Sequence, residues 1–199
     1  ASASASSEIA QLGLKAGKDV LIMSVGGLFL NGWDHLVKHK QSTGHLFVPS
    51  GAIGGLDALG AIGCEQIESV LLKTRKPPPG LAGVPYLESR GIDVRKIKEL
   101  TRVFSGNVEE AVKFFPQNIN VAASIALALH NSSKLQIEIY CDPAISRNIH
   151  EITASGSFGR FSFTTENVPS PENPKTSHLA VLSAVSAVEK ILGIVRIGT

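Results

Sequence analysis

The residue in this sequence best suited to proton transfer is His150. It lies in SRNIHEITASGSFGRF, a segment typical of a strand that leads into a tight turn, with Arg147 and Asn148 just before it. Imidazole titrates near neutral pH, so a histidine can serve as a general acid or base. In a strand, Asn148, His150 and Ile152 share one face. A single strand histidine can also be structural, and the local sequence leaves both interpretations open.

Two further segments could contact a cofactor. SGAIGGLDALG is rich in glycine, which permits close approach of a ligand or of another backbone, and a helix start offers unpaired N–H groups. Its spacing does not match the GxGxxG pattern, and the sequence contains no P-loop. In FPQNINVAA, Asn118 and Asn120 precede an apolar helix. They can cap that helix, or an asparagine amide can bind the carboxamide of a nicotinamide ring.

A third polar segment, ENPKTS, precedes the last predicted helix. Lys175, Thr176 and Ser177 bring a cation and two hydroxyl groups to a helix N-terminus. This combination is suited to binding a carboxylate. The alternative is a capped helix with a solvated lysine.

Composition limits the classes of protein that are compatible with the sequence. The 199 residues are 43% hydrophobic and 18% charged, which is typical of a globular protein with a sizeable core. A net charge of +2 gives no indication of a nucleic-acid partner. Cys64 and Cys141 have no metal-ligand spacing, and we expect a reducing, cytoplasmic location rather than a disulfide. No apolar run approaches the ~20 residues that cross a bilayer, so no membrane role is expected.

The elements that must position these residues follow from hydrophobic periodicity and turn signals. Residues 81–106 are expected to form loop and short elements, and a hairpin turn is expected at SGS, residues 155–157. Helices are predicted over 6–18, 31–44, 51–63, 107–116, 118–131 and 176–192. Asn107 is the expected cap of the fourth of these helices, and Thr176 or Ser177 that of the last. Strands are predicted over 20–25, 45–51, 68–76, 134–143, 147–156 and 157–167.

The order of these elements predicts an α/β protein. A helix followed by an apolar strand is typical of a parallel α/β unit, so the first fifty residues resemble the end of such a unit. The strands after residue 134 indicate an α+β domain with a mostly antiparallel sheet. A C-terminal helix completes the chain.

Several segments together resemble one family along nearly the whole chain, in order. They are GKDVLIMSVGGL, VPSGAIGGLDAL, TRKPP, FPQNINVAA, DPAISRNIHEI, GSFGRFSF, ENPKTS with the closing helix, and RIGT. On these segments the chain is identified as a member of the L-aspartate dehydrogenase family. The resemblance implies a Rossmann domain, a C-terminal catalytic domain that carries the dimer contact, and a homodimer. It also implies oxidation of L-aspartate with NAD or NADP to iminoaspartate, which hydrolyses to oxaloacetate and ammonia and can feed NAD biosynthesis.

The resemblance also implies roles for individual residues. His150 matches the catalytic residue, and Ala52 and Asn120 match positions that contact the dinucleotide. The resemblance does not assign the substrate carboxylate, for which Lys175, Thr176 and Ser177 are a hypothesis from their chemistry. No metal site is expected.

The resemblance divides the chain into three parts. Residues 1–50 are expected to be the remaining C-terminal portion of a Rossmann-like NAD(P)-binding domain, 51–174 the α+β catalytic and dimerisation domain, and 175–199 a C-terminal helix packing back on the Rossmann portion. The opening half of the Rossmann domain, roughly 60–70 residues with the glycine pattern, is expected to be missing. We therefore expect either a fragment or truncated isoform, or a cofactor-binding half that comes from elsewhere.

Other functions remain open from the sequence. The chain could be a non-catalytic, dehydrogenase-like interaction module, or a dehydrogenase of another amino or hydroxy acid. Without the resemblance, the residues indicate a small-molecule-binding α/β protein.

Overall fold

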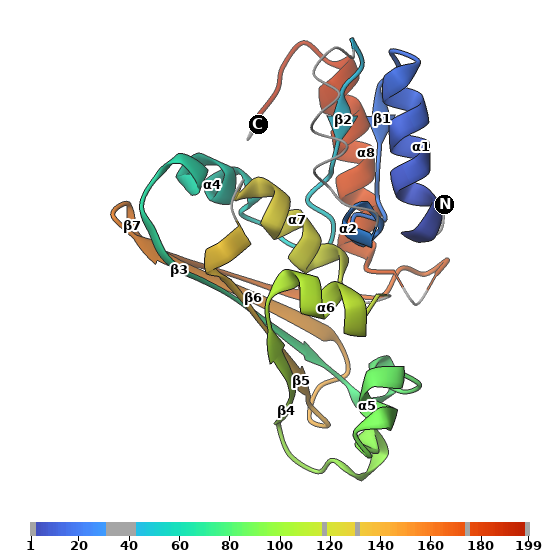
Figure 1. Cartoon of the computed structure of the whole chain (residues 1–199), viewed down its shortest axis with the longest axis vertical. Helices are drawn as coiled ribbons and strands as arrows, with labels where there is room; N and C mark the ends of the chain where they lie inside the picture. Colours follow the sequence, from blue (N-terminus) through green and yellow to red (C-terminus); the bar gives the residue numbers. More distant parts are fainter. Residues whose placement is uncertain (1–2, 31–42, 117–118, 130–131, 174–175, 198–199) are drawn as a thin grey trace.

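A small parallel sheet and a larger mixed sheet organise the chain (Figure 1). The computed structural model describes residues 3–30, 43–116, 119–129, 132–173 and 176–197. Most of the helix predicted over 31–44 lies outside these residues, as do Asn118 and Lys175. No helix of the described part is long and apolar enough to cross a membrane.

The N-terminal part contains the parallel pair of strands. Helix α1 (Ala3–Lys15) precedes β1 (Val20–Leu21), which pairs in parallel with β2 (Leu46–Phe47). The predicted helix and parallel strand are therefore confirmed, but the strand is shorter than 20–25. It ends because the chain turns into α2 (Gly26–Leu30), whose first turn begins with the N–H of Gly27 donating to the carbonyl of Ser24.

The larger sheet has five strands in the order β4-β5-β3-β6-β7. Only β3 and β5 pair in parallel, and the other three pairs are antiparallel, so the mostly antiparallel sheet is confirmed. The strands are β3 (Ile67–Lys76), β4 (Thr101–Gly106), β5 (Leu135–Cys141), β6 (Asn148–Gly156) and β7 (Gly159–Asn167).

The sequence did not identify one strand of this sheet and misplaced one turn. Edge strand β4 is among the short elements expected over 81–106, but it was not identified as a strand, because it buries only Val103 and Phe104, which gives little alternation to recognise. The β6–β7 turn is Ser157 and Phe158 rather than SGS, since Gly156 pairs with Gly159.

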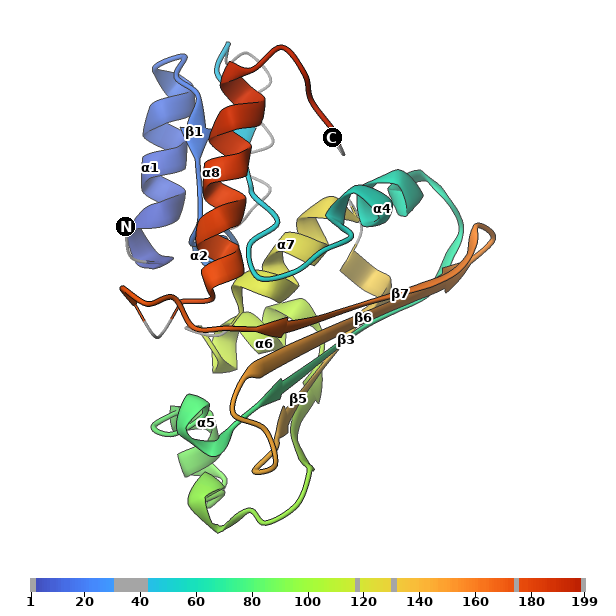
Figure 2. The ribbon, with the colours of Figure 1, turned by 180° about the vertical axis from the view of Figure 1, so that it is seen from behind.

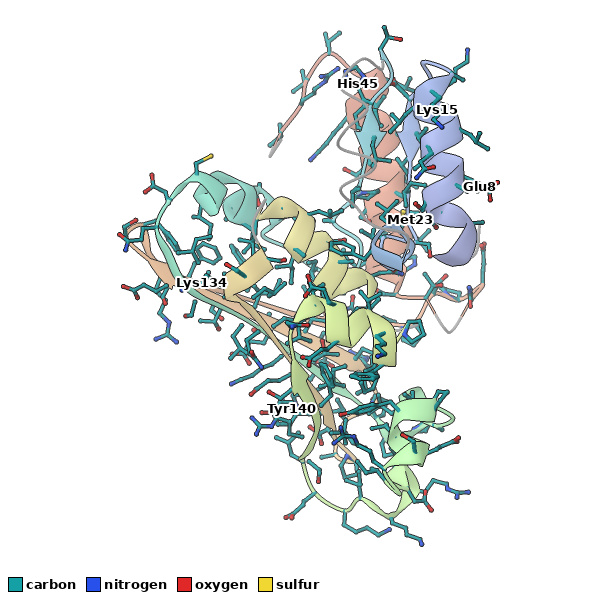
Figure 3. All side chains as sticks on the ribbon, in the orientation of Figure 1. Glu8, Lys15, Met23, His45, Lys134 and Tyr140 are labelled. Atoms are coloured by element: carbon teal, nitrogen blue, oxygen red, sulfur yellow. The ribbon has the colours of Figure 1, made fainter. Side chains whose placement is uncertain are left out.

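Helices cover one face of the five-stranded sheet. In Figure 1 they stand in front of the strands, and in Figure 2, from behind, the sheet stands in front of them. Figure 3 shows side chains filling the space between these helices and the sheet, where the main core lies. The covering helices are α4 (Leu56–Ala61), α6 (Val108–Phe114) and α7 (Asn120–Ala128).

The sequence located the start of α6 correctly but placed the start of α4 too early. The cap predicted at Asn107 is confirmed, because its side chain accepts from the N–H of Glu110 and the Glu110 carboxylate accepts from the N–H of Asn107. The helix predicted over 51–63 begins only at Leu56. The preceding Gly55 has φ 79°, which is outside helical geometry and favours glycine.

The C-terminal helix α8 (His178–Leu192) runs beside β1 and β2 in both views, whereas α5 (Pro85–Ser89) lies at the opposite end of the molecule (Figures 1 and 2). Ser177 occupies the N-cap position of α8, but its hydroxyl does not cap the helix. It donates instead to Oδ1 of Asn167. The predicted cap residue is therefore confirmed, but a tertiary contact takes the hydroxyl that would have capped the helix.

Candidate functional site

A cavity of about 160 Å³ lies where the two sheets meet the start of α8. Its lining comes from several elements, among them the loop after β2, the ends of β3 and β6, and the start of α7. Met23, labelled near α2 in Figure 3, also lines it. The predicted site residues among its lining are Ala52, Asn120, His150, Thr176 and Ser177.

His150 is buried near the start of β6, at the cavity wall. It pairs with Thr74 of β3, and its Nδ1 lies 3.0 Å from the Thr74 hydroxyl oxygen. Burial lowers the pKa of His150 to about 3, helped by the positive charge of Lys76. The ring is therefore neutral at pH 7. With Nδ1 engaged by Thr74, Nε2 is the nitrogen available for a ligand.

Lys76, which the sequence analysis did not single out, also lines the cavity. It is the last residue of β3 and only 7% exposed. Burial lowers its pKa to about 8, so it is mostly protonated at pH 7. The signal that could have found it was strand periodicity, since Leu72, Thr74 and Lys76 alternate on the buried face of β3.

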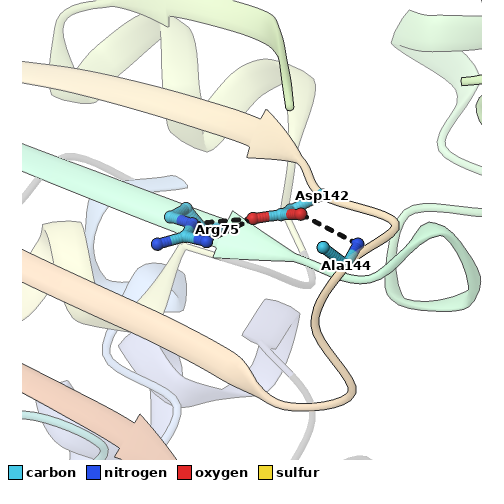
Figure 4. Close-up of polar contacts among 3 residues, drawn as sticks. All are labelled: Arg75, Asp142 and Ala144. Carbon is cyan, nitrogen blue, oxygen red and sulfur yellow. Dashed lines mark hydrogen bonds and ion pairs between the residues drawn. The ribbon is translucent and has the colours of Figure 1, made fainter. Parts of the chain in front are cut away.

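An ion pair fixes the end of β3 that carries Lys76. The Asp142 carboxylate accepts from Nε of Arg75 at 2.9 Å and from the N–H of Ala144 at 3.0 Å (Figure 4). Burial raises the pKa of Asp142, but the hydrogen bonds from Arg75 and Ala144 outweigh this and lower it. Because the Asp142 N–H also donates to the Lys76 carbonyl at 2.8 Å, the pair holds the ends of β3 and β5 together.

The loop that contains Ala52 is bound to β7 by side-chain hydrogen bonds. The Ala52 carbonyl accepts from the Thr165 hydroxyl and from Nδ2 of Asn167, each at 3.0 Å. Oδ1 of Asn167 in turn accepts from the Ser177 hydroxyl at 2.6 Å. Asn167, buried and not recognised from the sequence, thus joins the Ala52 loop, β7 and the start of α8.

Asn120 joins α7 to the start of α2. Its Oδ1 accepts from the N–H of Gly26 at 2.9 Å, so a contact with a ligand would use Nδ2. A Cβ at Gly26 would lie 2.5 Å from Cγ2 of Ile119, which explains the need for glycine at this approach. The side chain of Asn120 does not cap α7, whose N-cap is Ile119.

Thr176 and Ser177 differ in what they can offer a carboxylate. Oγ1 of Thr176 accepts from Nδ2 of Asn173 at 3.1 Å, which leaves its O–H to donate elsewhere. Ser177 already donates its hydroxyl proton to Asn167. No group of three or more metal-ligating side chains occurs within the described residues.

Comparison with known proteins places this arrangement in context. The family model described as "Aspartate dehydrogenase, C-terminal" matches residues 57–191. A protein of Methanosarcina barkeri named L-aspartate dehydrogenase is 48% identical over 191 residues, covering 94% of this chain and 69% of its own length. One of Nitrosopumilus maritimus with the same name is 40% identical over 192 residues, covering 96% and 70%. The crystal structure of an aspartate dehydrogenase from Thermotoga maritima superposes with a TM-score of 0.80 at 33% identity, covering 99% of this chain and 75% of that one.

Proposed function

Because the chain belongs to the L-aspartate dehydrogenase family, we propose that it catalyses the NAD(P)-dependent oxidation of L-aspartate to iminoaspartate, which hydrolyses to oxaloacetate and ammonia. The observation that carries the proposal is the shared cavity. Ala52, Asn120 and His150 are 30 or more residues apart in sequence, yet all three line it. We also propose that the iminoaspartate formed in this reaction feeds NAD biosynthesis.

The residues present fit the nicotinamide end of an NAD or NADP cofactor. The Nδ2 group of Asn120 is left to donate to a carboxamide, because Oδ1 already accepts from Gly26. The Ala52 loop beside it is held by hydrogen bonds from β7. A Cβ at the neighbouring Gly51 would meet no heavy atom within 4 Å, so this loop has open space next to it. When bound, the cofactor supplies hydride acceptance. Ala52 and Asn120 would hold and orient it.

His150 is the proposed proton acceptor. Its imidazole is neutral at pH 7 because burial and Lys76 lower its pKa to about 3. Nε2 would take a proton from the substrate amino group, and the Thr74 hydroxyl fixes the ring through Nδ1. The same nitrogen could activate the water that attacks the imine carbon.

For the substrate carboxylate, Thr176 has the free O–H to donate, whereas Ser177 supports a positioning role through Asn167. Lys175, outside the described residues, remains part of this carboxylate hypothesis.

The test is turnover by the complete enzyme with a panel of substrates. Production of reduced NAD or NADP is followed by absorbance with L-aspartate, L-glutamate, L-alanine and L-malate. We expect clear preference for L-aspartate and a loss of about 10²- to 10⁴-fold in kcat for His150→Ala. His45→Ala, at an exposed residue bound to Asp19, is the matched control and should be unaffected.

Three results would contradict the proposal in whole or in part. Turnover of another substrate in preference to L-aspartate would identify a different dehydrogenase. Absence of both turnover and NAD(P)(H) binding would favour the interaction module. Unchanged kcat in His150→Ala would remove the role of this residue.

A homodimer and a cytoplasmic location are part of the proposal. The candidate contact surface is the sheet face that α4, α6 and α7 leave uncovered, which carries polar side chains such as Arg102 and Glu138, 2.8 Å apart. Cys64 and Cys141 are both free thiols, which is compatible with a reducing compartment. Light scattering of the complete enzyme distinguishes dimer from monomer.

A further inference from the structure

A second cavity adjoins the one that contains His150. It has a volume of about 650 Å³, and its lining includes Arg147 and Pro79. Lys76, Asn148, Thr176 and Ser177 line both cavities and so form their common wall. A ligand at this wall would be in reach of the groups that line the His150 cavity while part of it extends into the larger space.

The charge of this wall favours an anion. Within the described part of the chain, no acidic side chain lines either cavity. Asp142, the acidic residue next to the end of β3, accepts from Arg75 and Ala144. The lining therefore presents a buried ammonium, amide and hydroxyl groups, and no carboxylate that would repel a substrate carboxylate.

Arg147 is less suited to this task than Lys76. It is exposed and forms an ion pair with Glu166 at 3.3 Å. Lys76 is buried, its position is fixed by the backbone hydrogen bond from Asp142, and it lines the cavity of His150 directly. Electrostatic attraction is stronger in such a desolvated position than at the surface.

We propose that Lys76 binds a carboxylate of the substrate at the wall between the two cavities. The inference rests on the proposed function, since it names the residue that recognises the anionic amino acid. It makes Lys76 a substrate-binding residue beside the proton acceptor, in a part of the site for which the sequence suggested Lys175. A carboxylate bound there also offsets the positive charge that disfavours protonation of His150, so proton acceptance becomes easier once substrate is present.

The test compares Lys76→Met with Lys73→Met in the complete enzyme. Lys73 lies on the same strand but on the other face, so it is the matched control. Succinate, a dicarboxylate without an amino group, reports binding without turnover in the presence of reduced cofactor. We expect its Kd, and the KM for aspartate, to rise roughly 10- to 150-fold in Lys76→Met, as for the loss of a hydrogen bond to a charged group. Lys73→Met should match the wild type, and cofactor affinity should be unchanged in both variants.

A measurement on the wild type covers the case in which Lys76→Met does not fold. Reductive methylation followed by peptide mass spectrometry gives the labelling rate of each lysine. Saturating succinate should slow labelling of Lys76 and leave Lys73 unchanged. Equal labelling of Lys76 with and without succinate, absence of succinate binding to the wild type, or an unchanged Kd in Lys76→Met would each overturn the inference.

The inference and the proposed function fail in different ways. If succinate binds through Lys76 but aspartate is not oxidised, the carboxylate site stands and the proposed reaction is wrong. If aspartate is oxidised with an unchanged KM in Lys76→Met, the reaction stands and the carboxylate site is wrong.

Discussion

The Nδ1 atom of His150 lies 3.0 Å from the hydroxyl oxygen of Thr74, directly across the β3–β6 pair. Both side chains are buried. One nitrogen of the ring is therefore used for orientation, and the other is left for chemistry in the cavity. Strand β3 carries Lys76 two residues after Thr74. Pairing of β3 with β6 therefore brings the proposed proton acceptor and the proposed carboxylate ligand to one wall.

Replacing Thr74 by valine removes the hydroxyl that orients His150. We expect kcat to fall roughly 2- to 10-fold, the effect of losing one hydrogen bond, and the free energy of unfolding to fall by about 1–3 kcal/mol because Nδ1 loses its partner. Steady-state kinetics and denaturant unfolding measure the two effects. Thr74→Ser keeps the hydroxyl and should restore kcat. Equal kcat in Thr74→Val and wild type would show that the ring does not need this contact.

The burial of His150 predicts that the protein is sensitive to mild acid. Its pKa is about 3 when folded and about 6.5 in an unfolded chain. Between these values the unfolded chain binds more protons, so stability is present above pH 6.5 and is lost as the pH falls towards 3. From pH 6.5 to pH 5 the loss should be about 1.6 kcal/mol.

Denaturant unfolding at several pH values between 5 and 6.5 measures this dependence. His150→Gln cannot titrate and should give a flatter profile than the wild type. The explanation would be wrong if both proteins lost the same free energy of unfolding over this range.

The hydrogen bond from Asn167 of β7 to the Ala52 loop predicts that this residue affects cofactor affinity. Asn167→Asp keeps an acceptor for Ser177 but replaces the Nδ2 donor to the Ala52 carbonyl with an oxygen. We expect the loop to be released and the Kd of reduced cofactor to rise roughly 10-fold, as for a lost hydrogen bond of about 1.5 kcal/mol. Cofactor fluorescence measures it, with Ser162→Ala, at an exposed position of β7, as the control. An unchanged Kd would separate this loop from the cofactor site.

Two glycines near α4 should respond to alanine in opposite directions. Gly55 has φ 79°, and a Cβ there would lie 2.3 Å from the ring of Phe163. Gly55→Ala should therefore lower the free energy of unfolding by about 1–3 kcal/mol. In Gly60→Ala the new Cβ has its nearest neighbour at 4.0 Å, so the variant should be about 0.5–1 kcal/mol more stable. Thermal unfolding of both variants checks the signs, and a stable Gly55→Ala would contradict the close approach.

Local patterns accounted for most of the fold. Strand-like runs located the strands after residue 134, and the cap at Asn107 marked the start of α6, because both signals depend only on neighbouring residues. The segment 81–106 was harder, since β4 is stabilised by pairing with β5, some 35 residues away, rather than by its own pattern. Ser177 is the N-cap residue of α8 as predicted, but the sequence could not show that Asn167 takes its hydroxyl.

The sequence by itself determined most of the elements, the residues that share one face of β6 with His150, and the family. Only the tertiary structure decided that Lys76 and Asn167 belong beside His150, Ala52 and Asn120. The physical reason is register and burial. A lysine at the end of a strand is ordinarily solvated. Lys76 becomes a desolvated cation at a cavity wall only because β3 pairs with β6, which sets Thr74 opposite His150, and because the start of α8 closes over that end.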